Sequence, residues 1–187
     1  DPMDFSQREA YAEELFQLRQ RKGLTRAESR ELLTHRHFLG PMMVRMGDAD
    51  GLIGGLVHKY ADTVRPALQT IGLDAKARLV AGTYMMVFKS ELMFFADPVI
   101  NIDPSAQELA EIALCTAETA RSFDVEPRVA MLSFSNFGSS RHPQADKVRQ
   151  ATKIVQQRAP DLVVEGEMQA DLALTPSMLE EAYPFAE

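Results

Sequence analysis

The chain has 187 residues, 45% of them hydrophobic and 25% charged, which is enough apolar content for one ordinary domain core. With 20 Lys and Arg against 27 Asp and Glu, the net charge is −7, and this argues against a dedicated nucleic-acid binder, which needs a basic face. The single cysteine, Cys115, excludes an internal disulfide, and no apolar run reaches the roughly 20 residues of a membrane span. We therefore expect a cytoplasmic protein without a nucleic-acid or membrane partner.

The first 40 residues predict a pair of helices. Apolar residues recur at helical spacing from 5 to 22, and Gly23 stands where a glycine commonly ends a helix. Thr25 and Glu28 then form the capping-box pattern that begins a second helix. We expect residues 1–40 to be a helical arm.

Residues 41–187 predict one α/β domain, because strand and helix patterns alternate along them. The sheet is expected to be largely parallel, and one antiparallel hairpin makes it mixed. The predicted elements, in chain order, are a strand at 42–46, helices at 49–60 and 66–71, strands at 78–88 and 92–95, a helix capped by Asp103 or Ser105, a strand at 129–134, a helix at 143–158, a strand at 162–164, and two short helices.

Three loops are expected near the carboxyl ends of buried strands, where open α/β sheets bind ligands: 47–51, 135–140 and 165–169. The loop at 135–140 has the composition best suited to an anion, because Ser135, Asn136, Gly138 and Ser139 offer hydroxyl groups and accessible backbone N–H groups before a helix. A capped turn whose serines serve only the helix start is an equally weighted interpretation.

Arg65 follows Asp62 and Thr63 and allows two interpretations. It forms a surface ion pair with Asp62, or it binds a phosphate group, which a guanidinium contacts through two parallel hydrogen bonds. The sequence alone does not decide between them.

Other motifs carry less. Gly51, Gly54 and Gly55 do not form a dinucleotide-binding fingerprint, and we interpret them as packing residues on a helix. His35 and His37 would diverge on a helix, so no metal site is expected.

Read together, several motifs resemble the phosphotransacetylase family, and they do so in order and spacing over nearly the whole chain. Two of them, SNFGS and GEMQ, look more like the phosphotransacetylase-like domain that follows the malate-oxidising domain in bacterial NADP-dependent malic enzymes. The matching stretches are LRQRKGLT (18–25), MVRMGDADGLIGG (43–55), ADTVRPALQTIG (61–72), FFADPVINIDPSAQELAEIA (94–113), EPRVAMLSFSNFGSS (126–140) and PDLVVEGEMQADLAL (160–174).

The resemblance implies a three-layer fold like that of isocitrate dehydrogenase, with coenzyme A in the cleft between two domains. Residues 1–40 would connect the central domain at 41–187 to an outer domain that the sequence lacks. In the transferases, arginines at the positions of Arg19 and Arg65 contact coenzyme A and phosphate. The residues expected to bind acetyl-CoA or phosphate are therefore Arg19, Asp62, Thr63, Arg65, Ser135, Asn136, Gly138 and Ser139.

One departure from the family shapes the functional prediction. Transferases typically carry a Ser-Thr pair just before Ala-Asp-Thr, and this chain has Lys59 and Tyr60 there. We therefore predict a catalytically inactive, acetyl-CoA-binding regulatory and oligomerisation domain of a malic enzyme. Its parent chain would decarboxylate malate oxidatively with NADP and Mg or Mn bound in a separate malic domain. The alternatives are a piece of an active phosphate acetyltransferase and a scaffold used only for assembly.

Overall fold

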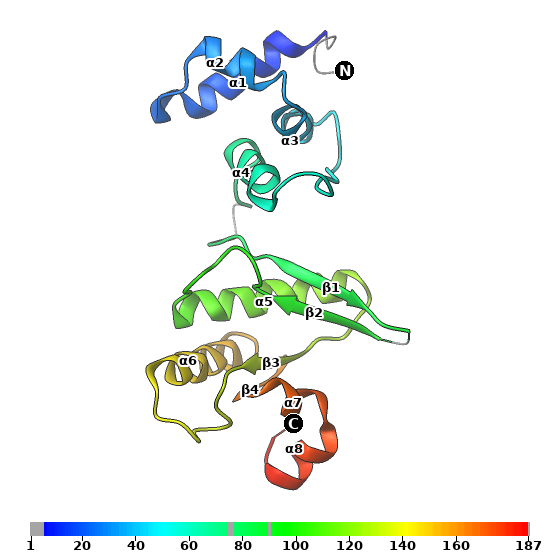
Figure 1. Cartoon of the computed structure of the whole chain (residues 1–187), viewed down its shortest axis with the longest axis vertical. Coiled ribbons are helices and arrows are strands. Elements are labelled where there is room, and N and C mark those ends of the chain that lie inside the picture. Colours follow the sequence, from blue (N-terminus) through cyan, green and yellow to red (C-terminus); the bar gives the residue numbers. More distant parts are fainter. Residues whose placement is uncertain (1–5, 75–76, 90, 187) are drawn as a thin grey trace. The chain divides into compact units, whose positions relative to one another are not determined.

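The computed structural model describes residues 6–74, 77–89 and 91–186, and it separates into two compact units, Asp1–Lys76 and Ala77–Glu187 (Figure 1). Each unit is described by itself. The expected domain boundary after residue 40 falls inside a helix of the first unit, and the division into an arm and a central domain stays a prediction.

The described part of the first unit is helical, and its core forms where the helices meet. Tyr11 and Leu15, four residues apart on one helix face, pack with Leu33 and Met42, and all four side chains are buried. The two predicted helix signals are confirmed, because Gly23 has φ +90° and Thr25 forms the capping box with Glu28. The elements are α1 (Arg8–Arg19), the short 3₁₀ helix η1 (Gln20–Lys22), α2 (Arg26–Leu32), α3 (Arg36–Met46) and α4 (Tyr60–Thr70).

Two predictions in this unit are wrong. Residues 42–46, predicted as a strand, are the last turn and a half of α3, since a short apolar run suits a buried helix as well as a strand. Residues 49–59, predicted as helix, form none, because glycines disfavour helix by about 1 kcal/mol each and the backbone turns to positive φ at Gly55 and Leu56. Helix α4 begins at Tyr60 and contains Pro66, which was expected to start it.

The second unit combines helices with two short sheets. Strands β1 and β2 form the predicted antiparallel hairpin, and β3 and β4 pair in parallel. Its elements are β1 (Thr83–Val87), β2 (Leu92–Ala96), α5 (Ala106–Ser122), β3 (Arg128–Leu132), α6 (Pro143–Arg158), β4 (Val163–Met168), α7 (Ala170–Leu174) and α8 (Pro176–Ala182).

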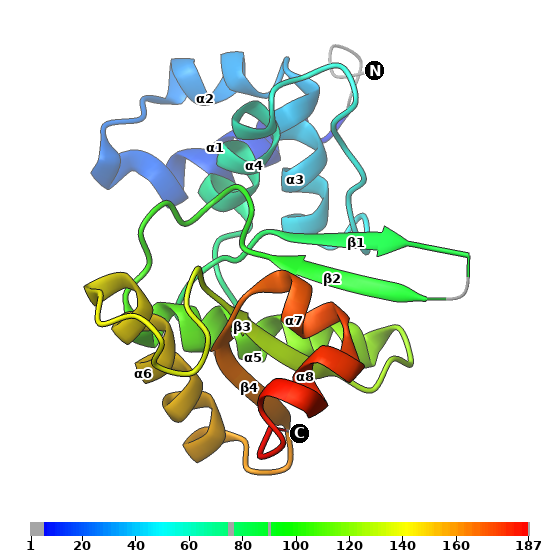
Figure 2. The same ribbon diagram turned by 60° about the horizontal axis from the view of Figure 1, so that its bottom comes forward.

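The core of the second unit lies where α5 and α6 meet β3 and β4. Small residues of α5, including Ala110 and Ala117, allow close packing against Ala151 and Val155 of α6 and Val164 of β4. The two views show α5 and α6 on one side of the β3–β4 pair and α7 with α8 on the other (Figures 1 and 2). Helices therefore cover both faces of the parallel strands, as parallel pairing requires.

The α/β class is confirmed, and one local prediction is corrected. Residues 165–169, predicted as a polar loop, belong largely to β4, which continues to Met168. Among the described residues the strands form two pairs, so the single, mostly parallel sheet in three layers stays a prediction. The α5 cap is Ser105, whose hydroxyl and Glu108 form the second of the two predicted starts.

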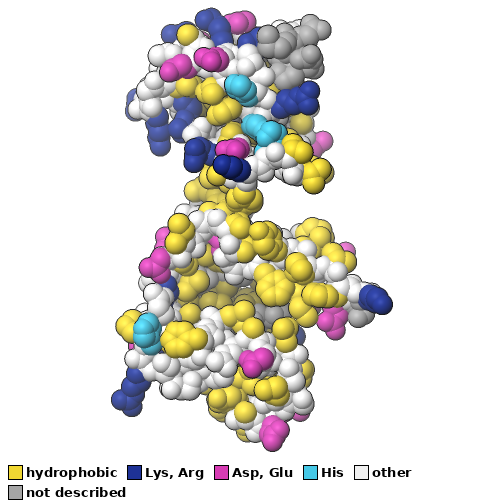
Figure 3. Space-filling view, in the orientation of Figure 1, with side chains coloured by type: hydrophobic (Ala, Val, Ile, Leu, Met, Phe, Trp, Pro, Cys, Tyr) yellow, Lys and Arg dark blue, Asp and Glu magenta, His cyan; other side chains and the backbone are white. Residues whose placement is uncertain are grey.

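The β1–β2 hairpin exposes apolar side chains on both faces. Tyr84, Met85, Met86 and Val87 are consecutive on β1 and are 49%, 43%, 43% and 70% exposed. Hydrophobic side chains accordingly gather over β1 and β2 in the space-filling view (Figure 3). Within the described ranges, no helix is long and apolar enough to cross a bilayer.

Candidate functional site

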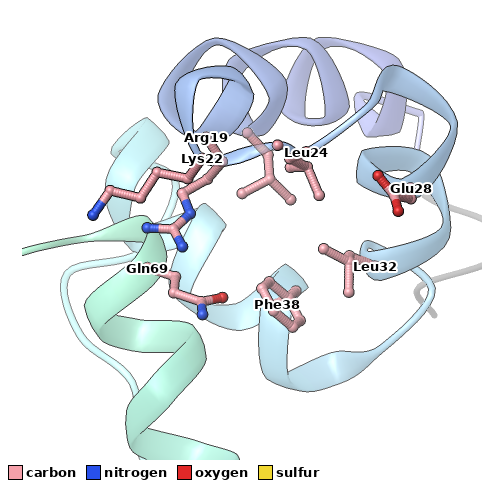
Figure 4. Close-up of a pocket in the computed structure, with 9 residues that line it drawn as sticks. Arg19, Lys22, Leu24, Glu28, Leu32, Phe38 and Gln69 are labelled. Atoms are coloured by element: carbon pink, nitrogen blue, oxygen red, sulfur yellow. The ribbon is translucent and has the colours of Figure 1, made fainter.

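A pocket of about 250 Å³ opens in the first unit between the end of α1, α2, α3 and α4. Apolar and polar side chains both line it (Figure 4). Arg19 and Lys22 come from the end of α1 and from η1, and Gln69 comes from α4. The remaining lining residues are Leu15, Gly23, Leu24, Glu28, Leu32 and Phe38.

Two cations, Arg19 and Lys22, and one carboxylate, Glu28, line this pocket, so its net charge is positive. The Glu28 carboxylate accepts hydrogen bonds of 2.8 Å from both the backbone N–H and the hydroxyl of Thr25, and these bonds lower the pKa of Glu28. Arg19 and Lys22 form no ion pair with any other described residue. Figure 4 shows the cationic ends of Arg19 and Lys22 on the α4 side of the pocket, near Gln69, and Glu28 on the opposite side. The pocket can therefore attract an anion.

Helix α4 continues the polar side of the pocket toward its own N-terminus. Asp62, Arg65 and Gln69 are spaced three and four residues apart, so they share one face of α4. Asp62 and Arg65 are both exposed, and no ion pair joins them within the described residues. The surface-pair interpretation of Arg65 is thus unsupported, and its guanidinium is available to a ligand.

Thr63 of α4, unlike Asp62 and Arg65, has a buried side-chain oxygen. Its Oγ1 is buried and has no hydrogen-bond partner in the described part of the chain. Its methyl group lies 3.2 Å from the position that a Cβ on Gly54 would take, so Gly54 serves packing as expected, although in a loop. A buried hydroxyl without a partner is rare and marks either strain or a missing binding partner.

In the second unit, the loop at 135–140 folds around a carboxylate of the protein itself. Glu167, fully buried at the end of β4, accepts hydrogen bonds on Oε1 from the Ser135 hydroxyl at 3.0 Å and from the Gly138 N–H at 2.8 Å. Arg149 of α6 donates to both oxygens at 2.9 Å, and it also pairs with Asp146. The loop therefore binds an anion, and that anion is internal.

The backbone donors of this loop are all in use. The N–H of Phe137 donates to the Glu167 carbonyl, and the N–H groups of Asn136, Ser139 and Ser140 donate to oxygens of the loop itself. The Asn136 side chain accepts from the Gln169 N–H at 2.6 Å. An external phosphate would thus have to replace existing bonds in order to bind these N–H groups.

The Glu167 carboxyl is held in its charged form. Burial alone raises the pKa of such a group, but the Arg149 guanidinium, the Gly138 N–H and the Ser135 hydroxyl outweigh it, and the pKa of Glu167 is lowered below 4.5. A buried, ionised carboxylate with a guanidinium partner is fixed in place, because its separation leaves an uncompensated charge.

The eight predicted ligand residues fall into two groups. Arg19, Asp62, Thr63 and Arg65 belong to the first unit, and Ser135, Asn136, Gly138 and Ser139 to the second. Their role as ligand contacts stays a prediction. Sequence reasoning missed Lys22 and Gln69, which lie within the matched motifs at 18–25 and 61–72, and it missed Glu167 and Arg149, whose pairing spans 18 residues and leaves no local signal. No group of three or more His, Cys, Asp or Glu within the described ranges could hold a metal ion.

Curated relatives carry the name phosphate acetyltransferase. The chain is 46% identical to the enzyme from Bacillus subtilis over 168 residues, which is 89% of this chain and 52% of that protein. It is 42% identical to the Synechocystis enzyme over 184 residues, 98% of this chain and 26% of that protein. The chain thus spans about half or less of the length of these relatives.

Solved structures agree. A phosphotransacetylase from Streptococcus pyogenes is 42% identical, with a TM-score of 0.89 over 99% of this chain and 56% of that one. The EutD phosphotransacetylase from Staphylococcus aureus is 36% identical, with a TM-score of 0.85 over 100% of this chain and 58% of that one.

These relatives overturn the main functional prediction. The predicted inactive regulatory domain of a malic enzyme is wrong, and so are the oxidoreductase activity and the NADP that were assigned to its parent, because the similar proteins are phosphate acetyltransferases. The error came from giving Lys59, Tyr60 and two short motifs more weight than the similarity over the rest of the chain.

The family comparison covers the whole sequence. The pattern of the phosphate acetyl/butaryl transferase family matches residues 1–187. The similarity extends through both units and includes the pocket, α4 and the loop at 135–140. The chain belongs to the phosphate acetyl/butaryl transferase family.

Proposed function

We propose that the chain is part of a phosphate acetyltransferase, which exchanges the acetyl group between coenzyme A and inorganic phosphate. The observation that carries the proposal is the 46% identity to the Bacillus subtilis enzyme across 89% of this chain. The function was the alternative raised by the sequence, and acyl-CoA is its expected partner. Self-association stays a separate prediction.

The pocket in the first unit supports this function. Coenzyme A combines phosphate groups with less polar parts, and the pocket combines the cations Arg19 and Lys22 with the apolar side chains of Leu24, Leu32 and Phe38. Guanidinium groups suit phosphate because they donate two parallel hydrogen bonds. We assign Arg19 to coenzyme A or phosphate, and we place Arg65 further along the same ligand.

The reaction needs no nucleophile from the protein. In one direction, the coenzyme A thiolate attacks the carbonyl carbon of acetyl phosphate, the C–S bond forms, and the C–O bond breaks with its electron pair leaving on phosphate. Arginine side chains would hold the phosphate and stabilise its charge as it leaves. Cys115, partly buried in α5 with a pKa raised by burial, is poorly suited to act as a nucleophile.

The test is the phosphate-dependent release of coenzyme A from acetyl-CoA by the full-length protein, measured by thiol titration with parallel detection of acetyl phosphate. Arg65→Ala is expected to lower kcat/KM by about tenfold to a hundredfold, because a charge-assisted hydrogen bond contributes about 1.5–3 kcal/mol. Arg36→Ala serves as a matched control, since Arg36 is an arginine at the start of α3 that does not line the pocket. Absence of turnover in the wild-type protein would overturn the proposal.

Lys59 and Tyr60 make a second arm of the same experiment. They are the N-cap and first residue of α4 and are both exposed, at the position where the family resemblance expects two hydroxyl groups. The double variant Lys59→Ser with Tyr60→Thr is expected to raise kcat. An unchanged or lower kcat would show that this pair is not what limits the rate.

A further inference from the structure

The carboxylate of Glu167 is fully buried and paired with Arg149 in the second unit, and the proposed reaction does not use it. Its side chain is 0% exposed, and four hydrogen bonds reach it from two parts of the fold: the loop at 135–140 through Ser135 and Gly138, and helix α6 through Arg149. A carboxylate that serves only in a structural ion pair needs no partner besides the cation. Here two donors from the loop converge on the oxygen that Arg149 also contacts.

The loop takes its shape from this carboxylate. Gly138 has φ +89° and Phe137 φ +45°, a left-handed turn that aims the Gly138 N–H at Glu167 Oε1. The buried Ser135 hydroxyl donates to Glu167 and accepts a hydrogen bond from the Ser140 N–H. One hydroxyl therefore links the carboxylate to the far end of the loop. Removing the carboxylate would leave Ser135, at the start of the loop, and Gly138, in its middle, without their common partner.

We propose that Glu167 is a positioning residue: it is an internal anion, gripped by Arg149, around which the loop at 135–140 folds, and it thereby sets the kinetics of the acetyl transfer without touching the substrates. This inference rests on the proposed function, and on the prediction from the sequence that the loop at 135–140 lies at the ligand site. It explains why a loop whose composition suits phosphate binding has no free backbone donors: the Glu167 carboxylate already occupies the anion position of the loop.

The experiment is a chemical rescue in the full-length protein. Glu167→Ala removes the carboxylate and leaves Arg149, the Gly138 N–H and the Ser135 hydroxyl around a space that a formate ion fits. We expect kcat/KM for acetyl-CoA to fall by about ten- to a hundredfold, and added formate to restore both activity and melting temperature in a saturable way. Formate is the probe because phosphate is itself a substrate. The phosphate concentration is held constant while formate is varied.

Two further variants separate positioning from simple stabilisation. Glu167→Gln keeps the side-chain volume but not the charge, so it should lose activity without responding to formate, and it remains testable if Glu167→Ala fails to fold. Glu111→Ala breaks another Glu–Arg pair, in which Arg158 contacts Glu111 at 2.7 Å between α5 and α6, away from the loop. It should lower the melting temperature, keep kcat/KM, and show no formate effect.

The outcomes are distinct. Formate-dependent recovery of activity in Glu167→Ala alone supports the proposal. Wild-type kinetics in both Glu167 variants, recovery of melting temperature without activity, or an equal formate effect in Glu111→Ala would each overturn it. If the wild-type protein shows no turnover, the proposed function fails, and formate-dependent stabilisation of Glu167→Ala, absent from Glu111→Ala, then decides whether Glu167 is the internal anion of the loop.

Discussion

The side-chain hydroxyl of Thr63 is a residue-scale feature whose effect on stability can be tested separately from its effect on ligand binding. Its Oγ1 is enclosed without a hydrogen-bond partner in the described structure, while its methyl group packs beside Gly54. Burying an unpaired hydroxyl is unfavourable, so this residue opposes folding slightly where it stands. A residue that costs stability in this way is a good candidate for a ligand contact.

Thr63→Val therefore makes a clear prediction. Valine keeps the methyl group and removes the hydroxyl, so the free energy of unfolding should stay unchanged or rise by up to about 1 kcal/mol. KM for phosphate or acetyl-CoA should rise several-fold if the hydroxyl contacts the ligand. Denaturant unfolding and steady-state kinetics on one preparation provide the check, and a destabilised variant with an unchanged KM would contradict it.

Glu167 shows the limit of sequence reasoning at the scale of residues. The sequence suggested either a ligand phosphate or a capped turn at Ser135 and Gly138, and in the structure both residues donate to the Glu167 carboxylate of the chain itself. The pairing with Glu167 could not be predicted, since Glu167 is 29 residues from Gly138 and was placed in a polar loop at 165–169. Only the pairing of β3 with β4 brings them together.

At the scale of elements, local chemical signals gave the correct answers. The Thr25 and Ser105 capping boxes were predicted from residues within one turn, and the helix at 143–158 from apolar residues at helical spacing. All three are confirmed. The apolar run at 42–46 failed, because its choice between strand and helix depends on packing against Tyr11 and Leu15, far away in sequence. Gly40 and Pro41, which disfavour helix locally, are accommodated inside α3.

Gly166 tests how tightly β3 and β4 fit. It has φ +142°, and a Cβ there would lie 2.6 Å from the carbonyl oxygen of Met131, beside the irregularity in the strand register. Gly166→Ala should destabilise the protein by about 2–4 kcal/mol, because strain and overlap add. Gly138→Ala is the comparison, since its φ is +89° but its nearest neighbour lies 4.0 Å away, and it should cost about 1–2 kcal/mol. Equal losses in chemical denaturation would refute the close approach.

At the scale of the whole molecule, the buried and paired carboxyls predict sensitivity to acid. Burial raises but hydrogen bonds lower the pKa of Asp97, and the pKa values of Glu111 and Glu167 are lowered chiefly by their arginine partners, against burial. Because these folded-state values lie below the ordinary values of 3.8 and 4.5, the folded protein binds fewer protons than the unfolded chain. Stability is therefore present above about pH 4.5 and is lost as the pH falls through the lowered values.

Glu167→Gln should flatten this dependence. The glutamine side chain does not titrate, so the contribution of Glu167 protonation to the pH dependence of unfolding is lost. The free energy of unfolding of the variant should therefore change less with pH below about 4.5 than that of the wild type. Glu118→Gln, an exposed position on α5, should retain the wild-type slope. Urea unfolding from pH 3 to 7 measures all three proteins, and parallel slopes for the wild type and Glu167→Gln would contradict the lowered pKa of Glu167.

The β1–β2 hairpin has a consequence for oxidation chemistry. Met85 and Met86 point to opposite faces of β1 and are each 43% exposed, whereas Met42, Met131 and Met168 are at most 7% exposed. A mild peroxide should convert the exposed methionines, Met85 and Met86 together with Met46 and Met178, to sulfoxides first and spare the core, making the strand polar while the rest of the chain stays folded. The thioethers of this one chain thus form an internal scale of burial, which peptide mass spectrometry can follow over time.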